Sequence, residues 1–152
     1  MSAVHTIDHR IHAGIITDLP GVLPVRVSLR YATPDPYAVA LVFTDHATPQ
    51  APETSWVFSR ELLARGVDAP EGAGQGCVSV VPLCSRHTAV ELRTADGTAV
   101  VRFPTGDVRR FLADSYRLVP AGAERADEHL DIFLAALTTL GAPPSTGRGE
   151  LP

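Results

Sequence analysis

The 152-residue sequence contains no lysine and no asparagine, and its only methionine is the first residue. All 13 basic residues are therefore arginine. Without lysine the chain cannot form a Schiff base, anchor pyridoxal phosphate, supply a P-loop lysine or use a Ser-x-x-Lys acylation pair. Without asparagine it has no acceptor for N-glycosylation and no Asn side chain to read adenine. These absences exclude several classes of enzyme and binding protein.

Positive charge, cysteine and long apolar runs are also scarce. The 17 acidic residues outnumber the 13 basic ones, and a net charge of −4 does not suit a protein that coats nucleic acid over its whole surface. Cys77 and Cys84 indicate a reducing compartment, and on one extended strand they would lie about 23 Å apart, too far for a disulfide. No run approaches the roughly 20 apolar residues of a membrane span. Residues 1–14 lack the apolar core of a secretory signal, so we expect a cytoplasmic protein.

The first two thirds of the chain show the alternation typical of β-strands. In residues 25–31 the apolar side chains fall on one face and the polar ones on the other: Val25, Val27, Leu29 and Tyr31 against Arg26, Ser28 and Arg30. Residues 37–44 are apolar on both faces, which predicts a central strand covered on both sides. Further strands are predicted over residues 7–15, 54–58, 77–83, 89–93 and 98–103. Thr94-Ala95-Asp96-Gly97 indicates a tight hairpin turn. A short helix is expected to be capped by Ser59 and ended by Gly66, followed by a loop over residues 68–76.

The last third is predicted to be helical. Apolar or small residues recur on one helix face, and the helix is expected to end at Pro120-Ala121-Gly122: Val108, Phe111, Leu112, Ser115 and Val119. A second helix is predicted from about residue 127 or 131 to Leu140, closed by Gly141. The order of elements predicts an α+β fold, with antiparallel β-sheets followed by two C-terminal helices. We expect one domain over residues 1–140 and a disordered Pro/Gly-rich tail over residues 141–152.

Two groups of residues have the spacing of binding sites. His5, His9 and His12 would converge on a metal if they lay on a helix, but on a strand His12 points away from the other two. The isoleucine spacing favours the strand, so no metal site is expected. Gly72-x-Gly74-x-Gly76 resembles a phosphate-binding loop, but a strand rather than a helix is predicted to follow it. A turn is the preferred interpretation.

No residue is predicted to be catalytic or to bind a cofactor or metal. Ser85 and His87 are the only close Ser–His pair, and they lack both a Gly-x-Ser-x-Gly elbow and a third residue to orient the histidine. Residues 86–117 hold six arginines against four acids, an excess that a solvated helix face explains. Trp56 and Phe58 share a strand face and are expected in the core rather than as a platform for stacked bases.

Several sequence blocks resemble the SsgA-like proteins of actinomycetes. They are Leu29-Arg30-Tyr31, Asp35-Pro36-Tyr37-Ala38-Val39, Trp56-Val57-Phe58-Ser59-Arg60-Glu61-Leu62-Leu63-Ala64-Arg65-Gly66, Gly97, Arg110-Phe111-Leu112, Val119-Pro120 with Gly122 and Glu124, and His129-Leu130-Asp131. The resemblance covers about residues 10 to 140. The chain differs from the family in its Pro-rich residues 45–53, in Val81-Pro82-Leu83 where a Trp-Pro pair is common, and in its longer tail. The lack of Lys and Asn beside abundant Ala, Arg, Gly and Pro indicates a GC-rich genome, in agreement with such a source.

The resemblance implies a non-enzymatic regulator of sporulation-specific cell division. Such a protein would be a cytoplasmic adaptor at the cell septum that helps recruit or position the FtsZ division machinery, with FtsZ or SsgA-type paralogues as partners. It also implies a barrel-like fold similar to the Whirly fold, assembled as a homotrimer, with no cofactor. The alternative is a single-stranded nucleic-acid-binding protein on a Whirly-like fold, which would use the arginines of residues 86–117.

Overall fold

The computed structural model describes residues 3–18, 20–44 and 54–124. They belong to two units, which divide between Leu118 and Val119. In the second unit the described residues form a turn, in which the Ala123 amide donates to the Pro120 carbonyl at 2.9 Å and Gly122 has a φ of 91°. The second predicted C-terminal helix and the predicted tail over residues 141–152 lie outside the described residues.

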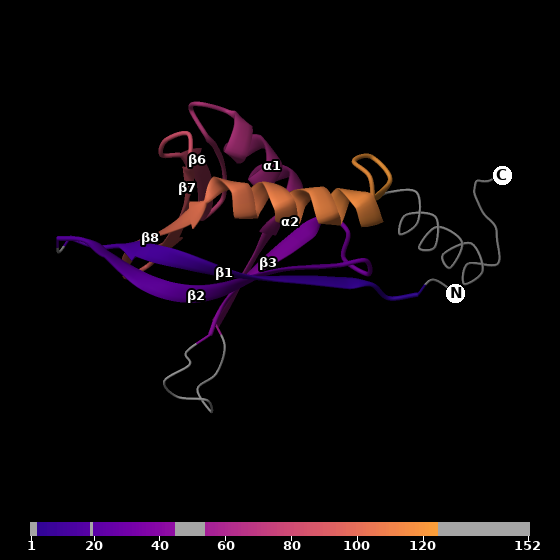
Figure 1. Ribbon diagram of the computed structural model, residues 1–152, viewed down its shortest axis with the longest axis horizontal. Coiled ribbons are helices and arrows are strands. Elements are labelled where there is room, and N and C mark those ends of the chain that lie inside the picture. Colours follow the sequence, from indigo (N-terminus) through magenta and orange to yellow (C-terminus); the bar gives the residue numbers. More distant parts are fainter. Residues whose placement is uncertain (1–2, 19, 45–53, 125–152) are drawn as a thin grey trace, which may run out of the picture. The chain divides into compact units, whose positions relative to one another are not determined.

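A single antiparallel sheet forms the frame of the first unit (Figure 1). Among the described residues it has eight strands, in the order β4-β3-β2-β1-β8-β7-β6-β5. Their bounds are β1 (Thr6–Ile16), β2 (Val22–Ala32), β3 (Ala38–Phe43), β4 (Thr54–Ser59), β5 (Ala73–Gln75), β6 (Val78–Pro82), β7 (His87–Thr94) and β8 (Gly97–Pro104). The short strand β5 lies within the predicted loop over residues 68–76, so the prediction of an irregular segment there is wrong for Ala73–Gln75.

The hairpin of β1 and β2 shows how the alternation of the sequence produces two different faces. Ile11 lies opposite Val27, and both side chains are almost fully buried. Arg10 lies opposite Ser28 and points to the other face, because successive residues of a strand alternate between faces. The prediction of an apolar and a polar face in residues 25–31 is confirmed for Val27, Leu29 and Tyr31, whereas Val25 is only half-buried.

Helix α1 (Arg60–Asp68) begins directly after β4. The predicted cap is confirmed, since the Ser59 hydroxyl accepts a hydrogen bond from the Leu62 amide at 3.1 Å. The prediction that Gly66 ends the helix is wrong, because the helix continues to Asp68. Gly66 instead allows α1 to approach β6 closely, since a Cβ at this position would lie 2.4 Å from the Cβ of Val80.

Helix α2 (Thr105–Leu118) lies across one face of the sheet, against β1 and β8 (Figure 1). The predicted stripe is confirmed within the helix, where its buried members are Val108, Phe111, Leu112 and Ser115. Helix α1 leaves the edge strand β4 but packs on β5 and β6 at the other end of the sheet. The sheet therefore curls into a half-barrel, and the predicted barrel-like α+β fold is confirmed.

The side chain of Arg60 is buried between the two helices and the sheet. It is 1% exposed, and its guanidinium carbon lies 4.7 Å from the ring centroid of Tyr31 and 4.0 Å from that of Tyr116. Its Nη1 atom donates to the Ser115 carbonyl at 3.0 Å. This one side chain thus joins the start of α1 to β2 and to the C-terminal part of α2.

Candidate functional site: a basic pocket on the outer face of the sheet

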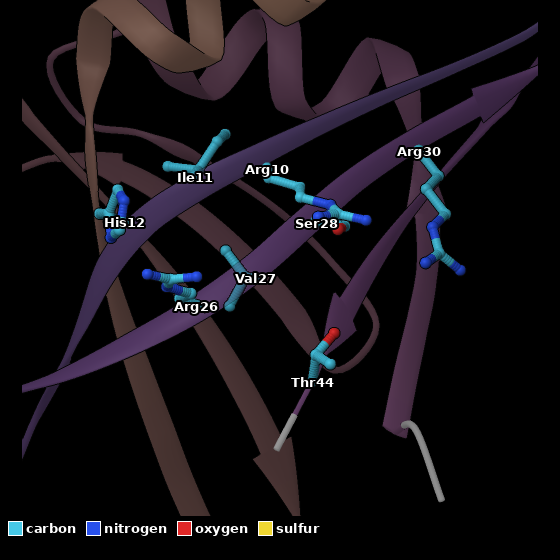
Figure 2. Close-up of a pocket in the computed structure, with 8 residues that line it drawn as sticks. All are labelled: Arg10, Ile11, His12, Arg26, Val27, Ser28, Arg30 and Thr44. Atoms are coloured by element: carbon cyan, nitrogen blue, oxygen red, sulfur yellow. The ribbon is translucent and has the colours of Figure 1, made fainter. Parts of the chain in front are cut away.

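A pocket of about 300 Å³ opens on the face of the sheet that is turned away from α2. We call it the basic pocket; it is lined by Arg10, Ile11, His12, Arg26, Val27, Ser28, Arg30 and Thr44. Figure 2 shows that these residues come from β1, from β2 and from the position that follows β3. Since β1 and β2 are neighbours in the sheet, their register decides which side chains meet in the pocket.

The register places the three arginines around Ser28. Arg10 lies directly opposite Ser28, and Arg26 and Arg30 lie two residues to either side of Ser28 on the same strand. Diagonal neighbours of this kind have Cα atoms about 7–8 Å apart. Ser28 itself is almost fully buried, whereas the side chains of Arg10 and Arg26 are exposed to solvent.

The lining of the pocket carries positive charge, and one of its three arginines is paired with an acid outside the lining. None of its eight lining residues is acidic. Asp8 lies beside it and accepts a hydrogen bond from Arg30 Nε at 3.0 Å. Within the part of the chain that the structure describes, Arg10 and Arg26 make no ion pair. Like charges on neighbouring strands repel each other, so the arrangement favours binding of an anion.

The arginines of residues 86–117 form no such group. Four of the six arginines in residues 86–117 are paired with acids: Arg93 with Glu91 at 3.9 Å, Arg109 with Asp68 at 2.7 Å, Arg110 with Asp107 at 3.1 Å and Arg117 with Asp114 at 3.1 Å. The excess of positive charge counted along this segment is therefore largely balanced by neighbouring acids. The polar face of residues 26–30 was visible in the sequence, but only its register with β1 reveals the basic pocket.

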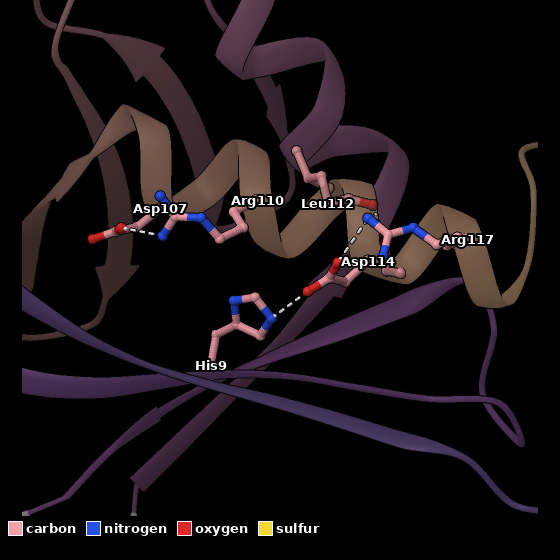
Figure 3. A network of polar contacts seen from close by, with 7 residues as sticks. His9, Asp107, Arg110, Leu112, Asp114 and Arg117 are labelled. Carbon is pink, nitrogen blue, oxygen red and sulfur yellow. Dashed lines mark hydrogen bonds and ion pairs between the residues drawn. The ribbon is translucent and has the colours of Figure 1, made fainter.

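The three N-terminal histidines do not converge. His12 lines the basic pocket, whereas His9 points to the opposite face, as expected for a strand. Its Nε2 atom lies 2.9 Å from Oδ2 of Asp114 (Figure 3). The His9 ring also packs edge-on against Phe111. Asp114 also pairs with Arg117 at 3.1 Å. The side chain of His9 therefore connects β1 with α2 through contacts with Asp114 and Phe111.

Replacing Asp114 with asparagine is expected to lower the free energy of unfolding by about 1 kcal/mol, because it weakens two polar contacts of a half-buried carboxylate. Replacing Arg117 with glutamine removes only the contact within the helix. This substitution is expected to lower the free energy of unfolding by no more than about 0.5 kcal/mol. Urea denaturation of both variants measures the difference. Equal losses would show that the contact between His9 and Asp114 does not stabilise the packing of α2 on β1.

The cysteines and the Ser–His pair lie around β6. Cys77 precedes this strand and Cys84 follows it, and both are free and exposed. Among the described residues, no hydrogen bond joins Ser85 to His87. The thiol of Cys84 instead lies 3.6 Å from Nδ1 of His87, at the turn between β6 and β7. No third group from the described part of the chain orients this imidazole as a catalytic triad requires.

The glycines of the Gly-x-Gly-x-Gly segment allow backbone conformations and close packing that other residues would not. Gly72 and Gly76 have φ values of 76° and 62°, which favour glycine. A Cβ on Gly72 would lie 2.6 Å from the Val80 carbonyl oxygen. Gly74 lies in β5, which pairs with β6, so no helix follows that could bind a phosphate at its N-terminus. In the strand β4, Phe58 is buried as predicted and Trp56 is half-buried.

The described residues contain no group of three or more His, Cys, Asp or Glu side chains arranged to hold a metal ion. No helix formed by these residues is both long enough and apolar enough to cross a membrane.

The sequence matches the family described as "Streptomyces sporulation and cell division protein, SsgA" over residues 25–124. The chain belongs to the SsgA family. This SsgA-family protein is 40% identical over 129 residues to the sporulation-specific cell division protein SsgB of Kineococcus radiotolerans, covering 81% of this chain and 73% of the relative. It is 34% identical over 129 residues to SsgB of Streptomyces coelicolor, covering 83% and 90% of the two chains.

Solved structures show the same fold. The SsgA-like sporulation-specific cell division protein of Thermobifida fusca superposes with a TM-score of 0.78 at 27% identity, covering 90% of this chain and 98% of the other. A structure of SsgB from Streptomyces coelicolor superposes with a TM-score of 0.72 at 31% identity, covering 83% and 98%. The resemblance inferred from the sequence blocks is thus confirmed. This SsgA-family member is an SsgB-like sporulation-specific cell-division protein, and the family is not known for enzymes.

Proposed function

We propose that this protein is a non-enzymatic adaptor that helps recruit or position the FtsZ division machinery at sporulation septa. The observation that carries the proposal is the family match over residues 25–124, together with the relatives named sporulation-specific cell division protein SsgB. The protein would act in the cytoplasm, at the septum, through contacts with FtsZ or with SsgA-type paralogues. Its predicted single domain over residues 1–140 would carry these contacts.

A homotrimer is part of the proposal. Several copies on one particle would present several docking surfaces to a polymer, and multivalent contact raises the apparent affinity without any new contact. Sedimentation equilibrium of the purified full chain is expected to give three times the mass of one chain. A monomeric mass at all accessible concentrations would contradict the proposed homotrimer. The adaptor role would then be tested by co-sedimentation alone.

Co-sedimentation tests the adaptor role. The full-length protein is expected to pellet with FtsZ polymers assembled with GTP and to stay in the supernatant with unassembled FtsZ, because an adaptor binds the assembled machinery. A pull-down with an SsgA-type paralogue tests the second partner. The polymers without the protein, and the protein without polymers, are the controls. Binding to neither FtsZ nor the paralogue would contradict the proposal.

A further inference from the structure

We propose that the basic pocket is a docking site for an acidic segment of a partner protein, one with carboxylates on alternate residues of an extended chain. The proposal rests on the adaptor function proposed above and assigns a surface and a ligand chemistry to it. It concerns the outer face of β1 and β2, and no residue outside the described ranges is needed for it.

The pocket differs in charge from the chain as a whole. The chain has a net charge of −4, yet the pocket gathers three arginines and a histidine with no acid among its lining residues. Arg30 pairs with Asp8 at 3.0 Å, whereas Arg10 and Arg26 have no acidic partner among the described residues. Grouped positive charges on adjacent strands destabilise a fold. Such a group is typical of binding sites, where stability is often lower than it could be.

The spacing of the pocket arginines matches the spacing of side chains on an extended peptide. Arg10 lies diagonally between Arg26 and Arg30, at Cα separations of about 7–8 Å. Residues i and i+2 of an extended peptide lie about 6.6 Å apart and point to the same side. Two carboxylates in a Glu-x-Glu segment can therefore face two of these guanidinium groups at once. The planar guanidinium fork binds a carboxylate through two parallel hydrogen bonds, so arginine suits this ligand better than lysine.

The size and lining of the pocket favour an acidic peptide over a nucleic acid. The pocket volume of about 300 Å³ equals roughly ten water molecules, which is room for a few side chains. Proteins that bind single strands stack successive bases on aromatic rings along a groove. No Phe, Tyr or Trp lines this pocket. The pocket can therefore bind carboxylates through its arginines, but it offers no aromatic ring on which a nucleobase could stack.

Fluorescence anisotropy with a labelled peptide of repeated Glu-x-Glu tests the proposal on the full-length protein. Binding is expected at low ionic strength and is expected to weaken as salt is added. The double variant Arg10→Gln/Arg26→Gln is expected to bind at least about tenfold more weakly, since it removes two of the three guanidinium groups. A peptide with Gln in place of every Glu is expected not to bind.

The matched control is the double variant Arg65→Gln/Arg86→Gln. It changes the net charge by the same amount, and both arginines are exposed, lie far from β1 and β2 in sequence, and make no ion pair among the described residues. Its affinity for the acidic peptide is expected to stay within about twofold of the original protein. Thermal denaturation completes the comparison: the pocket variant is expected to be no less stable than the original, because it relieves repulsion between neighbouring arginines.

Four results would overturn the proposal. The acidic peptide fails to bind the original protein, or the two double variants weaken binding equally. A single-stranded oligonucleotide of equal charge binds more tightly than the peptide and loses this affinity in the pocket variant, which would assign the pocket to nucleic acid. The pocket variant changes the mass seen by sedimentation, which would make this face a contact between copies of the chain.

The test also separates the pocket from the adaptor function. If the original protein and the pocket variant pellet equally with FtsZ polymers while neither binds the acidic peptide, the adaptor function stands and the pocket proposal fails. If the peptide binds in the pocket but the original protein binds neither FtsZ nor a paralogue, the adaptor function fails, and the pocket remains a site for acidic peptides from another source.

Discussion

Replacing Arg60 with alanine is expected to lower the free energy of unfolding by about 3 kcal/mol. The guanidinium group lies against the rings of Tyr31 and Tyr116, and a desolvated cation–π contact contributes about 2 kcal/mol. A hydrogen bond from a charged donor, such as the one to the Ser115 carbonyl at 3.0 Å, contributes about 1.5–3 kcal/mol.

Two opposing effects set the net value. Removing the charge relieves the desolvation of a guanidinium group that is only 1% exposed, which offsets part of the loss. Against this, truncation to alanine leaves a cavity between α1, α2 and β2 and leaves the carbonyl of Ser115 without this donor. The favourable contacts involve two rings and a hydrogen bond at one buried group, so we expect the loss to dominate.

Urea denaturation measures the change, with two controls. Arg65→Ala removes an exposed arginine from the same helix and is expected to change the free energy of unfolding by less than about 0.5 kcal/mol. Arg60→Lys keeps the positive charge but lacks the planar group that lies against the rings, so an intermediate loss is expected. If Arg60→Ala is as stable as Arg65→Ala, the buried guanidinium does not hold the two helices to the sheet.

Replacing Gly66 with alanine is expected to lower the free energy of unfolding by about 2–3 kcal/mol. In an exposed helix the same substitution stabilises by about 1 kcal/mol, so the expected sign is the reverse of the one that helix propensity predicts. The reason is the contact with β6, where a new Cβ would lie 2.4 Å from Val80 Cβ and 2.7 Å from the Val80 carbonyl oxygen. A backbone oxygen cannot turn aside as a long side chain can, so α1 must move away from the strand.

Gly106→Ala is the matched control. Gly106 lies in α2, is exposed, and has no neighbouring atom within 4 Å of an added Cβ. This variant is expected to be as stable as the original protein or more stable by up to about 1 kcal/mol. Thermal and urea denaturation of both variants test the contrast. A stabilising effect of Gly66→Ala would show that the close contact between α1 and β6 is absent in solution.

Helices and strands were predicted correctly from the sequence where one face of the element is buried and its residues recur with a regular period. The alternation of residues 25–31 predicted a two-faced strand, and the structure buries Val27, Leu29 and Tyr31. The stripe of α2 was predicted from its helical spacing for the same reason. The prediction failed at Gly66 and at β5, where the decisive neighbour is β6, which lies elsewhere in the chain.

The candidate site was less accessible to prediction. Residues 86–117 contain more arginines than acids, but pairing with acids such as Asp68, which lies 41 residues from Arg109, balances much of that charge. The basic pocket joins β1 to β2, and its existence depends on Arg10 lying opposite Ser28. A shift of the register by one residue would place Arg10 on the other face relative to its neighbours.

By itself the sequence determined the chemistry that the chain lacks, the family to which it belongs and the faces of its longest strands. Each of these follows from composition or from neighbours in the sequence. Only the tertiary structure decided that Arg60 is buried, that Gly66 is a contact point and that three arginines share one pocket. Arginine is mostly exposed in proteins, and a glycine late in a helical pattern commonly marks the end of the helix, so local patterns predict these common outcomes. The uncommon outcome arises from residues brought together by strand register and helix packing, which no local pattern contains.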